Sequence, residues 1–170
     1  MKEETRKITL PTGMIAPTMV DPELLILYGL PKVGKTALLA RLENALIVDL
    51  EKGAKYINAL KIEVNTIDEL TSVIKQVHAA GKPYDFAVID TVSKLEDMML
   101  PVALEMYKAT PMGSTFKGDD ILSLPNGGGY HYLRMAFSEW LRKIKFLADR
   151  IILVAHMKDS VIDKDGKDVT

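Results

Sequence analysis

A glycine-bounded loop places the strongest constraint on the fold of this chain. The loop follows the apolar run 24–28, precedes a Leu- and Ala-rich stretch over 36–44, and reads Gly29-Leu30-Pro31-Lys32-Val33-Gly34-Lys35-Thr36. The run predicts a strand buried on both faces, and the stretch predicts a helix. A Gly-x4-Gly-Lys-Thr loop between a strand and a helix is the setting in which this pattern binds phosphate.

Each part of this loop has a role in holding a phosphate group. Glycines let the backbone wrap with its N–H groups inward, the following helix directs its positive end at the same point, and Lys35 adds a full charge. Thr36 offers a hydroxyl to magnesium. The alternative, a glycine turn with an incidental lysine, is disfavoured by the strand–loop–helix setting. We expect a nucleotide to contact Gly29, Leu30, Pro31, Lys32, Val33, Gly34, Lys35, Thr36 and Ala37.

The rest of the chain alternates between apolar runs and helical patterns. Strands are predicted over 46–50, 86–90 and 151–155, with a weaker alternating run over 60–64. Helices are predicted from about 67 to 77 behind a capping box of Thr66 and Glu69, over 92–108 with Pro101 kinking or dividing it, and over 130–149. Alternating strands and helices predict an α/β fold, a three-layer α/β/α domain around a mainly parallel sheet.

The length of the chain fits a single domain. Its 170 residues suit one domain, which we place at 23–170 behind an N-terminal arm over 1–22.

The net charge of −1 gives no global positive field for nucleic acid or membranes, and the absence of cysteine excludes disulfides and thiolate sites. No signal peptide or membrane span is visible, so a cytoplasmic location is expected. A turn at 163–166 without a clear returning strand suggests that the natural chain continues beyond Thr170.

One carboxylate closes a predicted strand. Asp90 closes the run 86–90, where it would complete a magnesium site with Thr36; the alternative is an N-cap for the helix near Val92. Parallel strands deliver their carboxyl ends to one edge of the sheet, where ligands bind in such folds. The sequence therefore predicts Thr36 and Asp90 as magnesium ligands at this edge.

The second carboxyl-bearing segment is Asp49-Leu50-Glu51. Residues 47, 49 and 51 share a face if the strand pairs regularly, so Asp49 and Glu51 could both face the nucleotide edge. The alternative for Glu51 is a solvated carboxylate opposite Lys52 or Lys55.

Taken together, the Gly-Lys-Thr loop, the strand ending in Asp-x-Glu and the later Ile-Asp-Thr resemble the ATPase core of the RecA family over about residues 23–158. Within it, the chain is similar to phage RecA-like nucleotide-binding proteins of single-strand annealing and recombination, whose loop also reads Gly-x-Pro-Lys-x-Gly-Lys-Thr. The resemblance implies hydrolysis of Mg-ATP, with Lys35 at the phosphates and Glu51 activating the attacking water. It implies a γ-phosphate sensor at His156, where glutamine is usual; the alternative is a histidine satisfied by backbone.

The same resemblance implies single-stranded DNA and further copies of the chain as partners. The DNA-contacting loops of the family match, by position, residues 110–129, with Phe116 and Lys117 as a stacking and charge pair, and the stretch after His156. The helix over 130–149 adds a possible phosphate-tracking face, for which the alternative is an ordinary solvated face, with its basic residues at Arg134, Arg142 and Lys145.

Two other functions use the same loop. A small-molecule or nucleoside kinase would close an arginine-bearing lid over the phosphates, but the candidate lid, 110–129, contains only Lys117 as a basic residue. A nucleotide-dependent binding switch would recruit a protein through that loop and turn over little. No Asn-Lys-x-Asp guanine-reading signature is visible, which favours ATP.

Overall fold

The computed structural model describes residues 12–13 and 22–157. Apart from residues 12, 13 and 22, the arm expected over 1–22 lies outside this part, as does the turn expected at 163–166. Among the described residues, none of the helices combines the length and apolarity needed to cross a bilayer.

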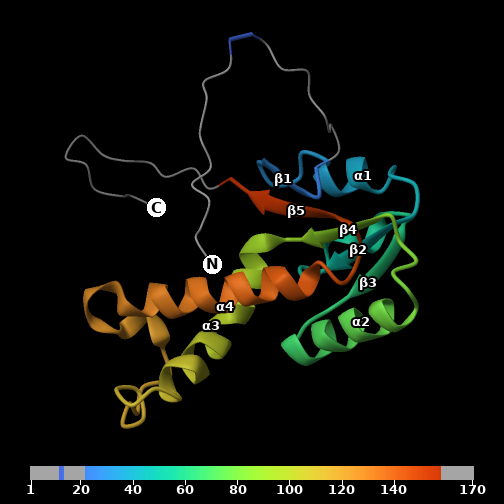
Figure 1. Ribbon diagram of the computed structural model, residues 1–170. Helices are drawn as coiled ribbons and strands as arrows, with labels where there is room; N and C mark the ends of the chain where they lie inside the picture. The colour runs from blue at the N-terminus through green and yellow to red at the C-terminus, as the bar shows by residue number, and fades with distance from the viewer. Residues whose placement is uncertain (1–11, 14–21, 158–170) are drawn as a thin grey trace, which may run out of the picture.

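Five parallel strands form one sheet at the centre of the structure (Figure 1). Their spatial order is β1-β5-β4-β2-β3, so the chain crosses over between several neighbours. The strands are β1 (Leu24–Gly29), β2 (Ala45–Asp49), β3 (Leu60–Glu63), β4 (Phe86–Asp90) and β5 (Arg150–His156). Because all five run the same way, their carboxyl ends lie along one edge, as the sequence predicts.

Helices cover both faces of this sheet. The short α1 (Lys35–Leu39) lies on one face, and α2 (Ile67–Ala79), α3 (Val92–Lys108) and α4 (Gly128–Ile144) lie on the other (Figure 1). Alternate residues of the central strands enter two separate cores: Ile47, Val88 and Ile152 pack on the α1 side, whereas Val48 and Ile89 pack on the other. This confirms the three-layer α/β/α fold.

The prediction that the first strand is buried on both faces is wrong. β1 pairs with β5 and lies at one end of the described sheet, and Ile26 and Tyr28 are 59% and 68% exposed. The apolar composition of a segment indicates that it can be buried, but it does not show where in the sheet the strand lies or which elements cover it.

The helices differ in detail from the patterns. The first ends at Leu39 rather than at 44, and the last begins at Gly128 and ends at Ile144. α3 continues through Pro101, which therefore does not divide it. Ring packing ties α3 to α4, with the rings of Tyr107 and Tyr132 5.1 Å apart and edge to face.

α2 begins with the predicted capping interaction. The Thr66 hydroxyl accepts a 3.2 Å hydrogen bond from the Glu69 N–H. The Glu69 carboxylate in turn accepts from the Asn65 N–H at 2.6 Å, and this hydrogen bond lowers the pKa of Glu69.

Candidate active site

The glycine-bounded loop joins the carboxyl end of β1 to the start of α1, as the sequence predicts. Its path needs left-handed backbone at Lys32 (φ 64°) and Gly34 (φ 93°). The Lys35 side chain, only 8% exposed, folds back so that its ammonium donates to the carbonyls of Gly29 (2.9 Å) and Leu30 (2.8 Å). The loop therefore holds one cation over the end of β1.

The helix that follows contributes less than expected. α1 has five residues, little more than one turn, so the aligned peptide dipoles that the sequence predicts behind the loop are few. Lys35 and the loop N–H groups are the main positive elements at this point.

Thr36 and Asp90 meet across the sheet edge. The Thr36 hydroxyl donates a 2.6 Å hydrogen bond to the Oδ2 atom of Asp90. Burial raises the pKa of Asp90, the hydrogen bond from Thr36 opposes that change, and the negative charges of Asp49 and Glu51 add to it. A cation placed here would relieve the cost of ionising this buried carboxyl.

This pair has the chemistry of a magnesium site. A hydroxyl and a carboxylate are the hard oxygen ligands that Mg²⁺ takes, with water and substrate phosphates completing its shell. Within residues 12–13 and 22–157, no group of three or more His, Asp or Glu side chains converges on a metal position. Thr36 and Asp90 could supply two oxygen ligands of such a cation. The alternative role of Asp90 as an N-cap is wrong, because Thr91 caps α3.

Glu51 lies beside this pair and is held at both carboxylate oxygens. The Thr91 hydroxyl donates to Oε1 at 2.5 Å, and His156 Nε2 lies 3.3 Å from Oε2. These contacts, and not Lys52 or Lys55, fix the carboxylate in the described part of the chain. The carboxylate is partly solvated, with its side chain 38% exposed, as the alternative expects, but among the described residues its hydrogen-bond partners are Thr91 and His156 and not Lys52 or Lys55.

His156 connects Glu51 to the loop. Its Nδ1 atom lies 3.1 Å from the Lys35 ammonium, in a register that places His156 opposite Gly29. An ammonium can only donate, so Nδ1 accepts and the ring proton is on Nε2, facing Glu51. The alternative of a histidine satisfied only by backbone is wrong.

Asp49 does not face the nucleotide edge as predicted. It is 1% exposed, and it accepts hydrogen bonds from the backbone N–H groups of Glu51 (3.1 Å), Gly53 (3.1 Å) and Ala54 (2.8 Å). The strand ends at Asp49, so the alternation expected for 47, 49 and 51 stops there. Asp49 instead fixes the turn that carries Glu51.

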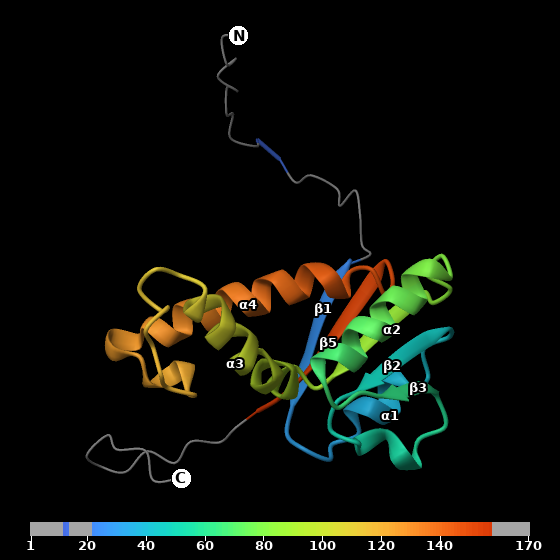
Figure 2. The same ribbon diagram turned by 90° about the horizontal axis from the view of Figure 1, so that it is seen from below.

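The segment 110–129 lies away from this site. It folds against the ends of α3 and α4 remote from α1 (Figures 1 and 2). The Phe116 ring packs edge to face on Tyr107, with centroids 5.4 Å apart, and Ile121 is buried. Phe116 therefore packs on α3, Lys117 is exposed, and their role as a stacking and charge pair for DNA stays a prediction.

The basic face expected on the last helix is only partly formed. Arg134 and Arg142 line one shallow hollow of about 350 Å³ together with His131 and Glu139. Lys145 is not part of it, and its ammonium lies 3.8 Å from the carboxylate of Glu23.

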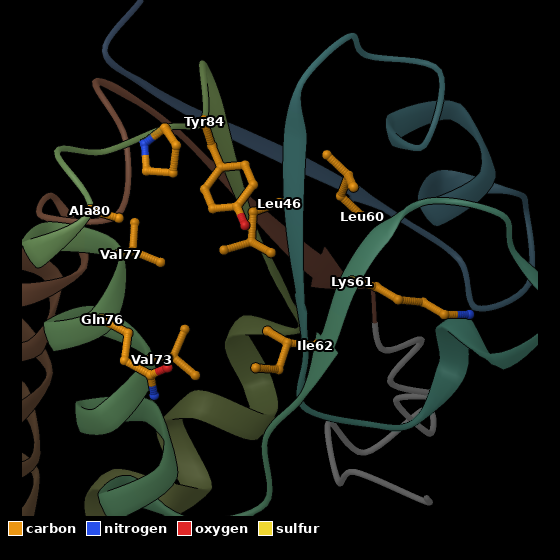
Figure 3. Close-up of a pocket in the computed structure, with 10 residues that line it drawn as sticks. Leu46, Leu60, Lys61, Ile62, Val73, Gln76, Val77, Ala80 and Tyr84 are labelled. Carbon is orange, nitrogen blue, oxygen red and sulfur yellow. The ribbon is translucent and has the colours of Figure 1, made fainter.

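A second hollow, of about 430 Å³, lies between α2 and the strands β2 and β3 (Figure 3). Its walls are mainly apolar and include Leu46, Ile62 and Val73. The Lys61 side chain points away from it, and its ammonium binds the carbonyls of the turn after Glu51, including that of Ile57 at 2.9 Å. None of the predicted site residues lines this hollow.

One residue at the site was missed by the sequence reasoning. Thr91 touches Glu51, and its only sequence signal is its place directly after Asp90 in Ile-Asp-Thr.

A family model described as an AAA domain matches residues 22–170, which include every strand of the sheet. No curated protein matches the sequence.

Proposed function

Because this chain belongs to the AAA domain family of P-loop ATPases, we propose that it binds Mg-ATP through residues 29–37 and hydrolyses it at the carboxyl edge of the sheet. We further propose that turnover is coupled to single-stranded DNA, in recombination of the phage RecA-like type.

The observation that carries this proposal is one connected set of side chains. Lys35 contacts His156, and His156 contacts Glu51, at 3.1 and 3.3 Å. The Thr36–Asp90 pair lies at the same edge. A cation for phosphate, oxygen ligands for magnesium and a carboxylate for water are what phosphoryl transfer to water requires.

Each residue has a role in this proposal that follows from its chemistry. Lys35 exchanges its bonds to the Gly29 and Leu30 carbonyls for bonds to phosphate oxygens. Thr36 and Asp90 would hold Mg²⁺, which when bound would draw charge from the phosphate oxygens. Glu51 accepts a proton from the attacking water and orients it.

His156 is the sensor in this proposal. Its Nδ1 atom now accepts from Lys35, so a phosphate that captures the lysine removes one of its two contacts. The ring then responds to the nucleotide while its Nε2–H still faces Glu51. This links occupancy of the loop to the carboxylate that activates water.

Support for the DNA partner is the resemblance together with two features of the fold. β5 ends at His156, so the chain leaves the sheet directly from the site. Arg134 and Arg142 share one hollow, where they could bind a phosphate backbone.

The test compares release of free phosphate from ATP with and without single-stranded DNA at two salt concentrations, with Lys35→Ala as the blank. We expect DNA to raise turnover and the increase to fade with salt, because phosphate contacts release counterions. Turnover that DNA leaves unchanged would contradict the coupling. ATP consumption that requires an acceptor and releases no phosphate would indicate a kinase.

A further inference from the structure

We propose that Thr91 is a positioning residue for hydrolysis, which holds the Glu51 carboxylate in the orientation that activates water. The inference rests on the proposed ATPase function and adds a residue that acts only through Glu51. The Thr91 hydroxyl bonds to Glu51 and to the Lys94 N–H.

The sheet brings the two residues together. Asp49 and Asp90 are paired in register on neighbouring strands β2 and β4. Just beyond them, the Leu50 N–H donates to the Asp90 carbonyl at 2.7 Å. The segments that follow β2 and β4 therefore stay side by side past the ends of the strands. Glu51 follows Leu50 and Thr91 follows Asp90, and the Thr91 hydroxyl lies 2.5 Å from Oε1 of Glu51.

The Thr91 hydroxyl is itself fixed. Thr91 is completely buried and caps α3, with its oxygen accepting from the Lys94 N–H at 3.4 Å. A hydroxyl has one proton, and here that proton is directed to Glu51. The hydrogen bond therefore ties a mobile acid to the rigid start of a helix.

Glu51 needs this hydrogen bond because little else restrains the orientation of its side chain. Its side chain is 38% exposed and has several rotatable bonds, whose freedom opposes a single orientation. The other anchor, His156, is also bonded to Lys35 and changes when that lysine moves to phosphate. Thr91 is the anchor that does not depend on the nucleotide.

The central variant is Thr91→Val, which removes the hydroxyl and keeps the branched shape. We expect kcat to fall roughly 10- to 100-fold, since small misplacement of a catalytic group costs rate on that scale. The Kd for Mg-ATP should stay within about twofold, because binding uses other residues. Thr91→Ser, which keeps the proton, should restore kcat. Should the valine variant not fold, Thr91→Ala takes its place.

A matched control separates positioning from stability. Thr66→Val removes the equivalent cap of α2, whose hydroxyl accepts from the Glu69 N–H, and should leave kcat unchanged. A Thr91→Val, Glu51→Gln double variant should be no slower than Glu51→Gln alone, because both changes act on one group.

Several results would overturn the proposal. They are wild-type kcat in Thr91→Val, equal loss in Thr91→Ser, or a further loss when Thr91→Val is added to Glu51→Gln. If Glu51→Gln loses turnover and Thr91→Val does not, the role of Thr91 alone is wrong. If Glu51→Gln turns over like the wild type, the role of Glu51 fails and that of Thr91 fails with it.

Discussion

The Lys35 ammonium lies 3.1 Å from Nδ1 of His156, which accepts the third of its three N–H groups. Its other two N–H groups go to the Gly29 and Leu30 carbonyls. An ammonium has three protons, so all of them are used before any phosphate arrives. Under the proposed function, nucleotide binding is an exchange of partners in which Lys35 gives up contacts that include the one to His156.

Glu51→Gln should separate binding from turnover. The amide keeps the size of the side chain but cannot accept a proton from water, so we expect kcat to fall roughly 10²- to 10⁴-fold. The Kd for Mg-ATP should change little. Single-turnover phosphate release and equilibrium titration measure the two quantities. Glu43→Gln, an exposed carboxylate outside the site, is the control, and equal rates in both variants would remove Glu51 from the mechanism.

Asp90 should make the protein without nucleotide or magnesium less stable as the pH rises. Its pKa is raised by burial above the ordinary value of 3.8, so the unfolded chain releases this proton before the folded one does. The penalty is absent below the ordinary value, grows through the interval between the two pKa values, and is complete above the raised one.

Asp90→Asn removes this titration and keeps an oxygen for the Thr36 hydroxyl. The variant should match the wild type in acid and exceed its free energy of unfolding near neutral pH. Urea titrations with a chelator present, over a range of pH, measure the difference. A difference that does not change with pH would show that ionisation of Asp90 is not its cause.

Asp49→Ala should destabilise the fold. It leaves three N–H groups of the turn after β2 without their buried acceptor, and hydrogen bonds to a charged group contribute about 1.5 to 3 kcal/mol each. Allowing for water reaching the exposed turn, we expect a loss of roughly 2 to 4 kcal/mol in the free energy of unfolding. The exposed Asp97→Ala should cost less than about 1 kcal/mol. Equal effects on urea unfolding would contradict the role given to Asp49.

Local patterns predicted much of the fold. The strand–loop–helix around Lys35 and the cap at Thr66 depend on neighbouring residues, so the sequence alone reveals them. The order of the strands depends on which runs pair across the sheet, and no local pattern encodes that. For the same reason, the apolar run 24–28 did not reveal that β1 ends the described sheet with its side chains exposed.

The candidate site divides in the same way. Lys35, Thr36, Asp90 and Glu51 were identifiable because each ends or follows a strand in a known motif. The contact of Thr91 with Glu51 arises from the β2–β4 register, which sets Asp49 opposite Asp90 and brings Glu51, two residues after Asp49, to Thr91. The inward turn of Asp49 likewise follows from three loop N–H groups that need an acceptor, which alternation along a strand does not reveal.

Calorimetric titration of the wild type and Lys35→Ala with Mg-ATP tests the central claim most directly. Lys35 is the buried cation of the loop, so its loss should weaken binding at least about 100-fold, as expected when a charged hydrogen-bond partner of phosphate is removed. Lys75→Ala, which changes an exposed lysine on α2, should bind as the wild type does. Saturable binding by the wild type that Lys35→Ala abolishes is the predicted result; no binding by the wild type, or equal binding by Lys35→Ala, would contradict the account.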